Sequence, residues 1–225
     1  MTNFERALAM VADGMTLGLG SGSASERFIA ALGERVRAGL KVRGVPTSQG
    51  SAALAAKVGI PLAELADALP IDITFDGADE VDSDLNLLKG FGNALVREKI
   101  VAASSRKLVI LIGPNKIREK LVDRLGARGK LPVEVLPFAL PLCIKRFAEL
   151  GYSSELVRKP SGEPFISDNG NPILHLKVQA IADPAALDRM LRDVPGVVGT
   201  GLFVGMADIV LIEDDGKVDV RERKK

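Results

Sequence analysis

The span from Asp76 to Glu98 contains the side chains best suited to acid–base chemistry. Two acids, Asp76 and Asp79, lie close together in DGADE, and Lys89 opens a glycine-rich loop downstream. The apolar and β-branched run IDITF before Asp76 predicts a strand, and a helix is predicted after Asn93. The reactive groups would therefore lie at a strand end and at a helix start.

The two aspartates allow two interpretations. Asp-Gly is a turn signal, and Glu80, Asp82 and Asp84 could continue it as a solvated acidic loop. Lys89 favours a functional interpretation, because a lysine with two nearby glycines that lead into a helix can stabilise a developing oxyanion through its charge and the N–H groups of the loop.

Glu98 differs from the other acids in its surroundings. On a helical wheel Arg97 and Lys99 each point about 100° away from it. Its helical neighbours are apolar: Ala94, Leu95, Val101 and Ala102. Such surroundings predict burial and a raised carboxyl pKa, as a general base requires. The alternative is a glutamate paired with Arg97, Lys99 or a neighbouring element.

The early loop GLGSGSASE offers N–H groups and the hydroxyls of Ser21, Ser23 and Ser25 at a predicted helix start, which is typical of an anion site. A dinucleotide fingerprint is not met, because Ser23 takes the place of its third glycine and no ribose-binding acid ends the next strand. A P-loop is also absent from the sequence. The alternative is a tight turn without a ligand.

Composition narrows the class of protein. The 225 residues carry a net charge of +1, with 47% apolar and 26% charged residues, as expected of a globular chain. No basic excess suggests nucleic acid, and 4% aromatics supply few stacking platforms. No apolar run approaches the ~18 residues of a membrane span, and the first residues do not resemble a signal peptide. We expect a cytoplasmic protein without nucleic-acid or membrane partners.

The single cysteine and the single histidine limit the chemistry further. Cys143 lies on an amphipathic segment, where a small buried apolar role is expected. His175 alternates with Leu174 and Leu176 in a predicted strand and is expected on its exposed face. With one histidine, a Ser-His-Asp triad and a multi-histidine metal site are disfavoured.

Strands and helices alternate in the first part of the chain and predict an α/β fold, a Rossmann-like doubly wound, mostly parallel sheet. In such sheets ligands bind beyond the carboxyl ends of the strands, where Gly20, Thr47 and Asp76 would lie. The strands are expected at 15–19, 41–46, 71–75 and 107–113, and the helices before residue 15, up to 36 and at 51–59.

The pattern changes near residue 131. From 131 to 204 the predicted order is βαββαβ, with VVGTGLF as the last strand, which is the order of a smaller ferredoxin-like α+β domain. The tail is a predicted hairpin with Asp215-Gly216 at its turn, and ADIVLI is expected to return to the main sheet. Residues 1–130 plus 205–225 would then form the catalytic domain.

Together these motifs resemble the ribose-5-phosphate isomerase type A family. GLGSGSA, DGADE, LKGFGNALVREKI, PNK, LPVEV, SDNGN and PGVVGTGLF occur in the family's order over essentially the whole chain. The resemblance implies interconversion of D-ribose 5-phosphate and D-ribulose 5-phosphate in the non-oxidative pentose phosphate pathway. It also implies no cofactor and no metal, a lid-like smaller domain, and a homo-oligomer, either a dimer or a tetramer.

The resemblance assigns roles to particular residues. Glu98 corresponds to the base, Lys89 to the catalytic-loop lysine, and Asp76 and Asp79 to the catalytic aspartates. The substrate-binding positions are Ser21, Gly22, Ser23, Ala24, Gly77, Ala78, Gly90, Phe91, Gly92 and Lys116. This chain departs from the usual pattern at Ala24, which lacks a hydroxyl, and at Phe91 and Asn93, where small residues are common.

The expected mechanism is proton transfer from C2 to C1 by Glu98 through an enediolate. Two alternatives belong to other classes of protein. A non-catalytic sugar-phosphate sensor would keep the anion loops without needing the base, and an acyl-CoA transferase-like enzyme would use a carboxylate to attack a thioester.

Overall fold

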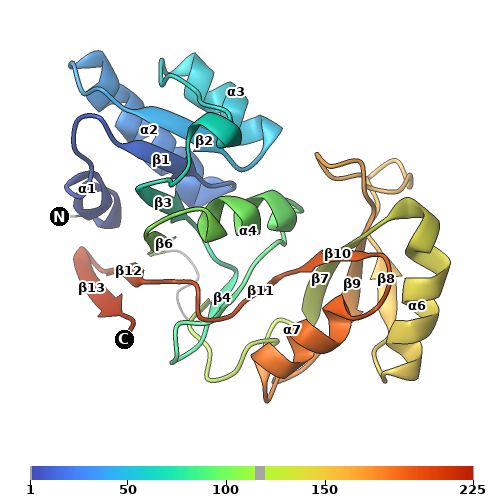
Figure 1. Ribbon diagram of the computed structural model, residues 1–225. Coiled ribbons are helices and arrows are strands. Elements are labelled where there is room, and N and C mark those ends of the chain that lie inside the picture. Colours follow the sequence, from blue (N-terminus) through green and yellow to red (C-terminus); the bar gives the residue numbers. More distant parts are fainter. Residues whose placement is uncertain (1, 115–119, 225) are drawn as a thin grey trace. The chain divides into compact units, whose positions relative to one another are not determined.

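The computed structural model describes residues 2–114 and 120–224, which form two compact units (Figure 1). The first unit comprises Met1–Ala78, Arg97–Lys120 and Gly205–Lys225, and the second comprises Asp79–Val96 and Leu121–Val204. Each unit has its own sheet and its own apolar core.

A six-stranded sheet organises the first unit, in the order β13-β12-β6-β3-β1-β2. The five strands from β12 to β2 are parallel, and β13 is antiparallel to β12. This confirms the mostly parallel α/β sheet and the return of the C-terminal hairpin to it. The strands are β1 Thr16–Leu19, β2 Arg43–Pro46, β3 Ile73–Asp76, β6 Leu108–Ile112, β12 Ile209–Asp214 and β13 Lys217–Glu222.

Helices cover both faces of this sheet. They are α1 Asn3–Leu8, α2 Ser23–Arg37, α3 Gln49–Lys57 and α4 Leu95–Ala103, with a short 3-10 turn η1 Leu65–Asp67. Capping boxes at Thr2 and Ser48 explain where α1 and α3 begin. On one face Phe28 of α2 stacks on Phe75 of β3, and on the other Val101 of α4 packs with Val45.

The second unit contains the predicted βαββαβ order. Its four-stranded sheet has the order β10-β7-β9-β8, and every neighbouring pair is antiparallel. Phe147 of α6 and Leu191 of α7 pack on the same face of this sheet, which confirms the ferredoxin-like arrangement. The elements are β7 Lys130–Val135, η2 Pro137–Ala139, α6 Leu140–Glu149, β8 Ser154–Leu156, β9 Ile173–Lys177, α7 Pro184–Arg192 and β10 Val197–Thr200.

A three-stranded sheet, β11-β5-β4, was not expected from the sequence. It consists of β4 Glu80–Val81, β5 Leu87–Leu88 and β11 Leu202–Phe203. The expectation of one strand over VVGTGLF is wrong, because β10 and β11 belong to different sheets. Gly201 separates them: a Cβ there would collide with the carbonyl oxygen of Lys89, and the Lys89 N–H donates to the Gly201 carbonyl over 2.8 Å.

These pairings place residues 79–96 and 121–130 in the second unit, whereas the sequence pattern assigned them to the first domain. The reason is long-range pairing of short strands, since β5 pairs with β11 and Val81 bridges to Leu121. A catalytic domain with a lid-like partner stays a prediction. Within the described part of the chain, no helix combines the length and the apolar character that crossing a membrane requires.

Candidate active site

Asp76, the last residue of β3, is a buried and firmly held carboxylate. Only 1% of its surface is exposed. Its Oδ1 accepts hydrogen bonds from the Ser21 N–H (3.2 Å), the Ser25 hydroxyl (3.0 Å) and the Gly77 N–H (2.7 Å). A Cβ at Gly20 would collide with this oxygen, so the absence of a side chain there makes the arrangement possible.

In the early serine loop, the Ser21 side chain is hydrogen-bonded, whereas Gly22 and Ser23 are exposed. The Ser21 hydroxyl lies 2.8 Å from the Thr47 hydroxyl and donates to the Ser48 hydroxyl over 2.7 Å. Ser23, by contrast, is exposed at the first position of α2. The N-cap, Gly22, is exposed, has φ of +82° and makes no side-chain cap. Only this exposed segment keeps the character of an anion site.

Glu98 is buried, as predicted, with 6% of its surface exposed. The helix itself is not buried on every side, because Ile100 is 46% exposed. The helix α4 runs antiparallel to β3, since the Ile71 N–H at the start of that strand segment donates to the Ser104 carbonyl at the helix end (3.0 Å). The first turns of α4 therefore lie toward the carboxyl ends of the strands.

Within the first unit, the geometry brings Glu98 and Asp76 to the same face of the sheet. A Cβ at Gly18 would meet both Thr74 of β3 and Val101 of α4, so the side chain of Thr74 faces α4. Asp76 lies two residues further along β3 and faces the same way, about 7 Å nearer the strand end. Glu98 precedes Val101 by one helical turn, about 5 Å in the same direction.

In the second unit, Asp79 and Lys89 lie on either side of the β4–β5 hairpin. The Asp79 N–H donates to the Leu88 carbonyl (3.0 Å), and Asp79 Oδ2 accepts from the Phe91 N–H (2.9 Å). Lys89 is 3% exposed, with Nζ 5.5 Å from the centre of the Phe203 ring. Asp79 is thereby linked to the glycine loop that follows Lys89.

That loop has an unusual backbone. Gly90 has φ of +98° and Asn93 has φ of +66°. The Asn93 N–H donates to the Gly90 carbonyl (2.9 Å), which closes a turn before α4. Gly92 is exposed and open space surrounds the place where a Cβ would be. The loop therefore presents backbone rather than side chain at this position, as an oxyanion site requires.

Comparison with known proteins identifies the family. A family model described as ribose 5-phosphate isomerase A (phosphoriboisomerase A) matches residues 43–217. The chain belongs to the ribose 5-phosphate isomerase A family. Ribose-5-phosphate isomerase A of Thermomicrobium roseum is 50% identical over 97% of this chain and 91% of its own length. That of a Roseiflexus species (strain RS-1) is 47% identical over 96% and 92%.

Solved structures of the family have the same fold. Ribose 5-phosphate isomerase from Plasmodium falciparum superposes with a TM-score of 0.92 and 37% identity, over 99% of this chain and 97% of that chain. A D-ribose-5-phosphate isomerase in complex with phospho-erythronic acid also has a TM-score of 0.92 and 37% identity, over 98% and 96%. This member of the family is accordingly an isomerase of the pentose phosphate pathway that interconverts D-ribose 5-phosphate and D-ribulose 5-phosphate.

The predicted site residues of this ribose 5-phosphate isomerase A family member divide between the two units. The first unit contains Ser21, Gly22, Ser23, Ala24, Asp76, Gly77, Ala78 and Glu98, and the second contains Asp79, Lys89, Gly90, Phe91 and Gly92. Lys116 lies outside the described residues. No group of three or more histidine, cysteine or acidic side chains in residues 2–114 and 120–224 is arranged to hold a metal ion.

The interpretation of a solvated acidic loop is wrong for Glu80 and Asp82, whereas Asp84 is exposed. Glu80 is fully buried, and its two oxygens accept from the N–H groups of Gly126 (2.6 Å) and Arg128 (2.7 Å). Asp82 is also buried and accepts from the N–H groups of Asp84 and Asn86. Glu80 and Asp82 thus stabilise loops by accepting hydrogen bonds from backbone N–H groups. No local pattern in the sequence distinguishes them from surface acids.

His175 and Cys143 both belong to the second unit. The expectation of an exposed histidine is wrong: His175 is half-buried, and burial, together with the nearby charge of Lys130, lowers its pKa to about 4. Cys143 is fully buried, as predicted, and burial raises the pKa of its thiol.

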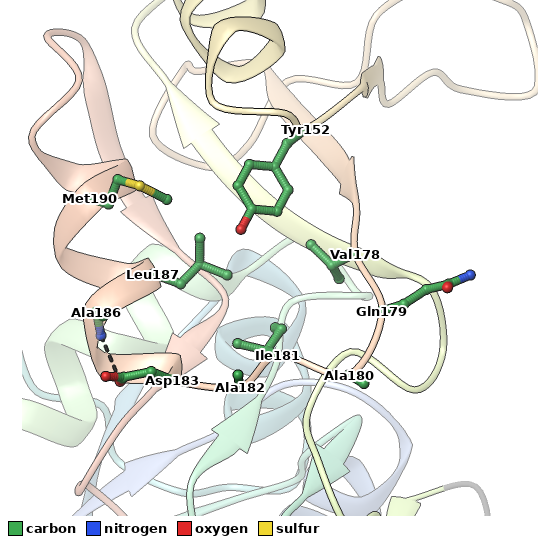
Figure 2. A pocket seen from close by; sticks show the side chains of 10 residues that line it. All are labelled: Tyr152, Val178, Gln179, Ala180, Ile181, Ala182, Asp183, Ala186, Leu187 and Met190. Atoms are coloured by element: carbon green, nitrogen blue, oxygen red, sulfur yellow. Dashed lines mark hydrogen bonds between the residues drawn. The ribbon is translucent and has the colours of Figure 1, made fainter.

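A hollow of about 320 Å³ in the second unit contains none of the predicted site residues (Figure 2). Tyr152, Leu187 and Met190 turn apolar surface toward it. Asp183 at its rim is engaged as the N-cap of α7, where it accepts from the Ala186 N–H (2.9 Å). Its other ionisable side chain is that of Tyr152, so the hollow lacks the paired acids and the lysine of the predicted site.

Proposed function

We propose that Glu98 is the base of the isomerisation. Its carboxylate would remove the C2 proton of open-chain ribose 5-phosphate, forming the C1–C2 double bond and placing negative charge on O1. The same group would return the proton to C1 while the carbonyl forms at C2. The observation that carries this proposal is a buried glutamate on the same sheet face as Asp76, near the strand ends.

Lys89 and the N–H groups from Gly90 to Asn93 would stabilise the enediolate oxygen. Lys89 is almost fully buried, so its charge acts with little screening by water. The turned backbone of this loop supports the same role, because its N–H groups need no rearrangement when negative charge develops.

Asp76 and Asp79 would bind the sugar hydroxyls and move a proton between O2 and O1. That transfer is required for balance, because the hydroxyl proton on O2 of the aldose must end on O1 of the ketose. The three hydrogen bonds to Asp76 Oδ1 hold its carboxyl group in one orientation. The Phe91 N–H orients Asp79 in a similar way.

The start of α2 and Lys116 are the proposed contacts for the phosphate or a hydroxyl of the substrate. The first N–H groups of α2 follow Gly22 without a side-chain cap, and a helix start favours anions. Ser21, Gly22, Ser23 and Ala24 form this segment. A related isomerase is known in complex with phospho-erythronic acid, a phosphorylated sugar acid, which supports binding of a sugar phosphate here.

We also propose a homodimer or homotetramer that works in the cytoplasm without a cofactor. Family resemblance supports these points. Light scattering of the purified protein would measure the oligomer, and cell fractionation would locate it. A monomer at micromolar concentration, or activity that a chelator abolishes, would contradict them.

Glu98→Gln tests the proposed base, because the two side chains have nearly the same shape. General acid–base transfer is typically worth ~10²–10⁴-fold, so we expect kcat to fall by at least about 10²-fold. Circular dichroism and thermal unfolding should show that the fold is kept. The matched control is Glu34→Gln, an exposed glutamate of the same unit, which should turn over normally.

Solvent exchange and substrate binding test the proposal further and separate it from a sugar-phosphate sensor. In heavy water, the wild type should incorporate solvent deuterium at C1 of the ketose product, because a carboxylic acid exchanges its proton with solvent. Near-normal turnover by Glu98→Gln would contradict the base assignment. Binding of ribose 5-phosphate without ketose formation by the wild type would instead indicate a sugar-phosphate sensor.

A further inference from the structure

Phe91 stands between two glycines in the loop after Lys89, and two cations lie over its ring. The guanidinium carbon of Arg128 lies 4.8 Å from the ring centre, and Nζ of Lys130 lies 4.2 Å from it. Both distances are within the range in which a cation is attracted to an aromatic ring. We call Phe91, Arg128 and Lys130 the Phe91 clamp.

The loop that carries Arg128 is itself held by a buried acid. Glu80 is 0% exposed, and its carboxylate accepts from the N–H groups of Gly126 (2.6 Å) and Arg128 (2.7 Å). Charge-assisted hydrogen bonds of this kind are about twice as strong as neutral ones. The backbone of Arg128 is therefore fixed with respect to Glu80.

These contacts form a closed circuit. Glu80 holds Arg128, the Arg128 side chain contacts the ring of Phe91, and the Phe91 N–H donates to Asp79 (2.9 Å), which precedes Glu80 in the chain. Every member of the circuit belongs to the second unit. The loop is thus held at Phe91 through both the ring and the backbone N–H.

We propose that Phe91 is a positioning residue for the isomerisation: its ring, held by Arg128 and Lys130, keeps the Lys89 loop in the conformation that receives the enediolate. The proposal rests on the role assigned above to Lys89 and the loop N–H groups. Gly90 and Gly92 flank Phe91, and glycine loses more backbone freedom on ordering than any other residue. An anchor between them therefore reduces the entropy lost when the transition state forms.

A purely structural role makes a different prediction. Phe91 is half-buried and packs partly against the apolar core of the second unit. If that packing were its only function, leucine would replace it, because leucine keeps apolar contact but has no ring quadrupole. Phe91→Leu therefore separates the clamp from the packing.

The experiment compares Phe91→Leu, Phe91→Tyr and the double variant Arg128→Gln/Lys130→Gln. The glutamines remove the cations but leave the Arg128 N–H available to Glu80. For Phe91→Leu and for the double variant we expect kcat to fall about three- to tenfold, as two cation–π contacts allow. KM and the melting temperature should change little, and Phe91→Tyr, which keeps the ring, should recover most of the rate.

A double-mutant cycle provides the decisive readout. Combining Phe91→Leu with Arg128→Gln/Lys130→Gln should lower kcat no further than either change alone. Arg124→Gln, an exposed arginine in the segment before Gly126, is the matched control and should leave kcat unchanged. Wild-type kcat in Phe91→Leu, or fully additive losses, would overturn the clamp.

The two proposals fail in distinguishable ways. If Glu98→Gln loses activity while Phe91→Leu turns over normally, the base assignment stands and the clamp fails. If Glu98→Gln turns over normally, the proposed mechanism fails whatever the Phe91 variants do.

Discussion

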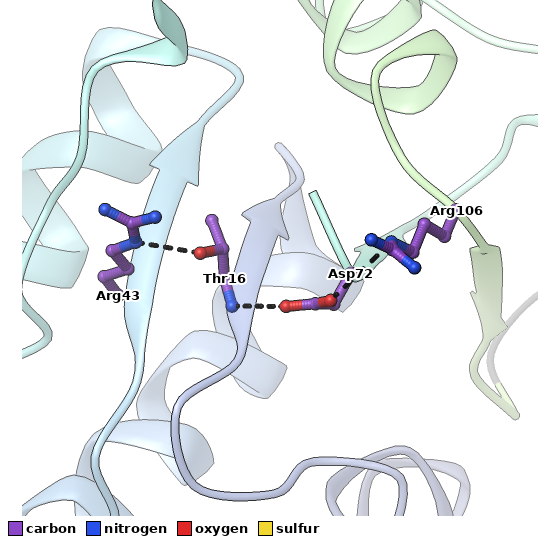
Figure 3. Close-up of polar contacts among 4 residues, drawn as sticks. All are labelled: Thr16, Arg43, Asp72 and Arg106. Atoms are coloured by element: carbon purple, nitrogen blue, oxygen red, sulfur yellow. Dashed lines mark hydrogen bonds and ion pairs between the residues drawn. The ribbon is translucent and has the colours of Figure 1, made fainter. Parts of the chain in front are cut away.

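Polar side chains join the strands at both ends of the first unit's sheet, but they differ in burial. At the amino ends, Arg43 Nε donates to the Thr16 hydroxyl (2.8 Å), and the Thr16 N–H donates to Asp72 (2.8 Å) (Figure 3). Arg106 Nε lies 4.0 Å from Asp72, with side chains 69% and 38% exposed. This network ties β1 to β2 and to the segments before β3 and β6.

At the carboxyl ends, the polar network includes Asp76, Ser25 and Thr47, and all three are buried. A buried polar group is costly to leave without its hydrogen bonds, whereas an exposed ion pair contributes little to stability. Similar residue types thus serve two purposes. The network at the amino ends, in which only Thr16 is buried, joins strand ends. The buried network at the carboxyl ends holds Asp76 in one orientation, as we expect of a site that handles substrate.

The largest expected contrast is between Asp76→Asn at the carboxyl ends of the strands and Asp72→Asn at their amino ends. Asparagine can keep a carbonyl oxygen for the three donors, so the fold should be retained. It cannot take up a proton, so kcat should fall by about 10²-fold or more. Steady-state kinetics and thermal unfolding measure the two effects. An active Asp76→Asn variant would show that the carboxyl-end network is structural only.

Lowering the pH should have the next largest effect, through the half-buried His175 of the second unit. Nε2 of His175 is buried and has no hydrogen-bond partner among the described residues. Its pKa is lowered to about 4 from an ordinary 6.5, chiefly by burial and then by Lys130, while Glu155 opposes the shift. The unfolded chain therefore binds the proton more readily between these values, so stability should fall as pH falls from about 6.5 to about 4.

The loss from this residue should reach about 3.5 kcal/mol at most, since one pKa unit corresponds to about 1.4 kcal/mol. Urea unfolding at pH 7 and pH 4.5 would measure it. The variant His175→Gln, which does not titrate, should lose less stability over the same range. An identical pH dependence in both proteins would contradict the assignment to His175.

A smaller effect is expected from Ser25→Ala. The Ser25 hydroxyl is fully buried and donates to Asp76 Oδ1, as do the N–H groups of Ser21 and Gly77. Its removal should cost about 1–2 kcal/mol of stability and a severalfold loss of kcat, because the N–H groups of Ser21 and Gly77 still hold the carboxylate. Chemical denaturation and kinetics would test this. Unchanged stability and activity would show that the Asp76 carboxyl group is oriented by the backbone alone.

The smallest effect is expected from Asp72→Asn at the amino ends. The Thr16 N–H keeps an acceptor, and only the long, exposed contact with Arg106 is weakened. Stability should change by less than about 1 kcal/mol, and kcat should not change. A loss of activity comparable to that of Asp76→Asn would remove the distinction between the two ends of the sheet.

Much of the fold follows from local signals. Apolar runs mark β3 and β6, Asp215-Gly216 marks the last hairpin, and the apolar neighbours of Glu98 indicate its burial correctly. The sequence alone did not reveal the sheet of β4, β5 and β11, because its two-residue strands have no usable periodicity. It also did not distinguish Glu80, which holds Gly126 across 46 positions of the chain, from a surface acid.

The sequence by itself therefore determined the α/β class, the family motifs and the residues capable of proton transfer, because these depend on neighbours in the chain. The tertiary structure decided which polar groups are engaged. The Ser21 N–H and the Ser25 hydroxyl bind Asp76, Glu80 binds a distant loop, and Phe91 contacts two cations. These hydrogen-bond and cation–π partners are brought together only when distant segments pack, so short-range patterns of residue type do not predict them.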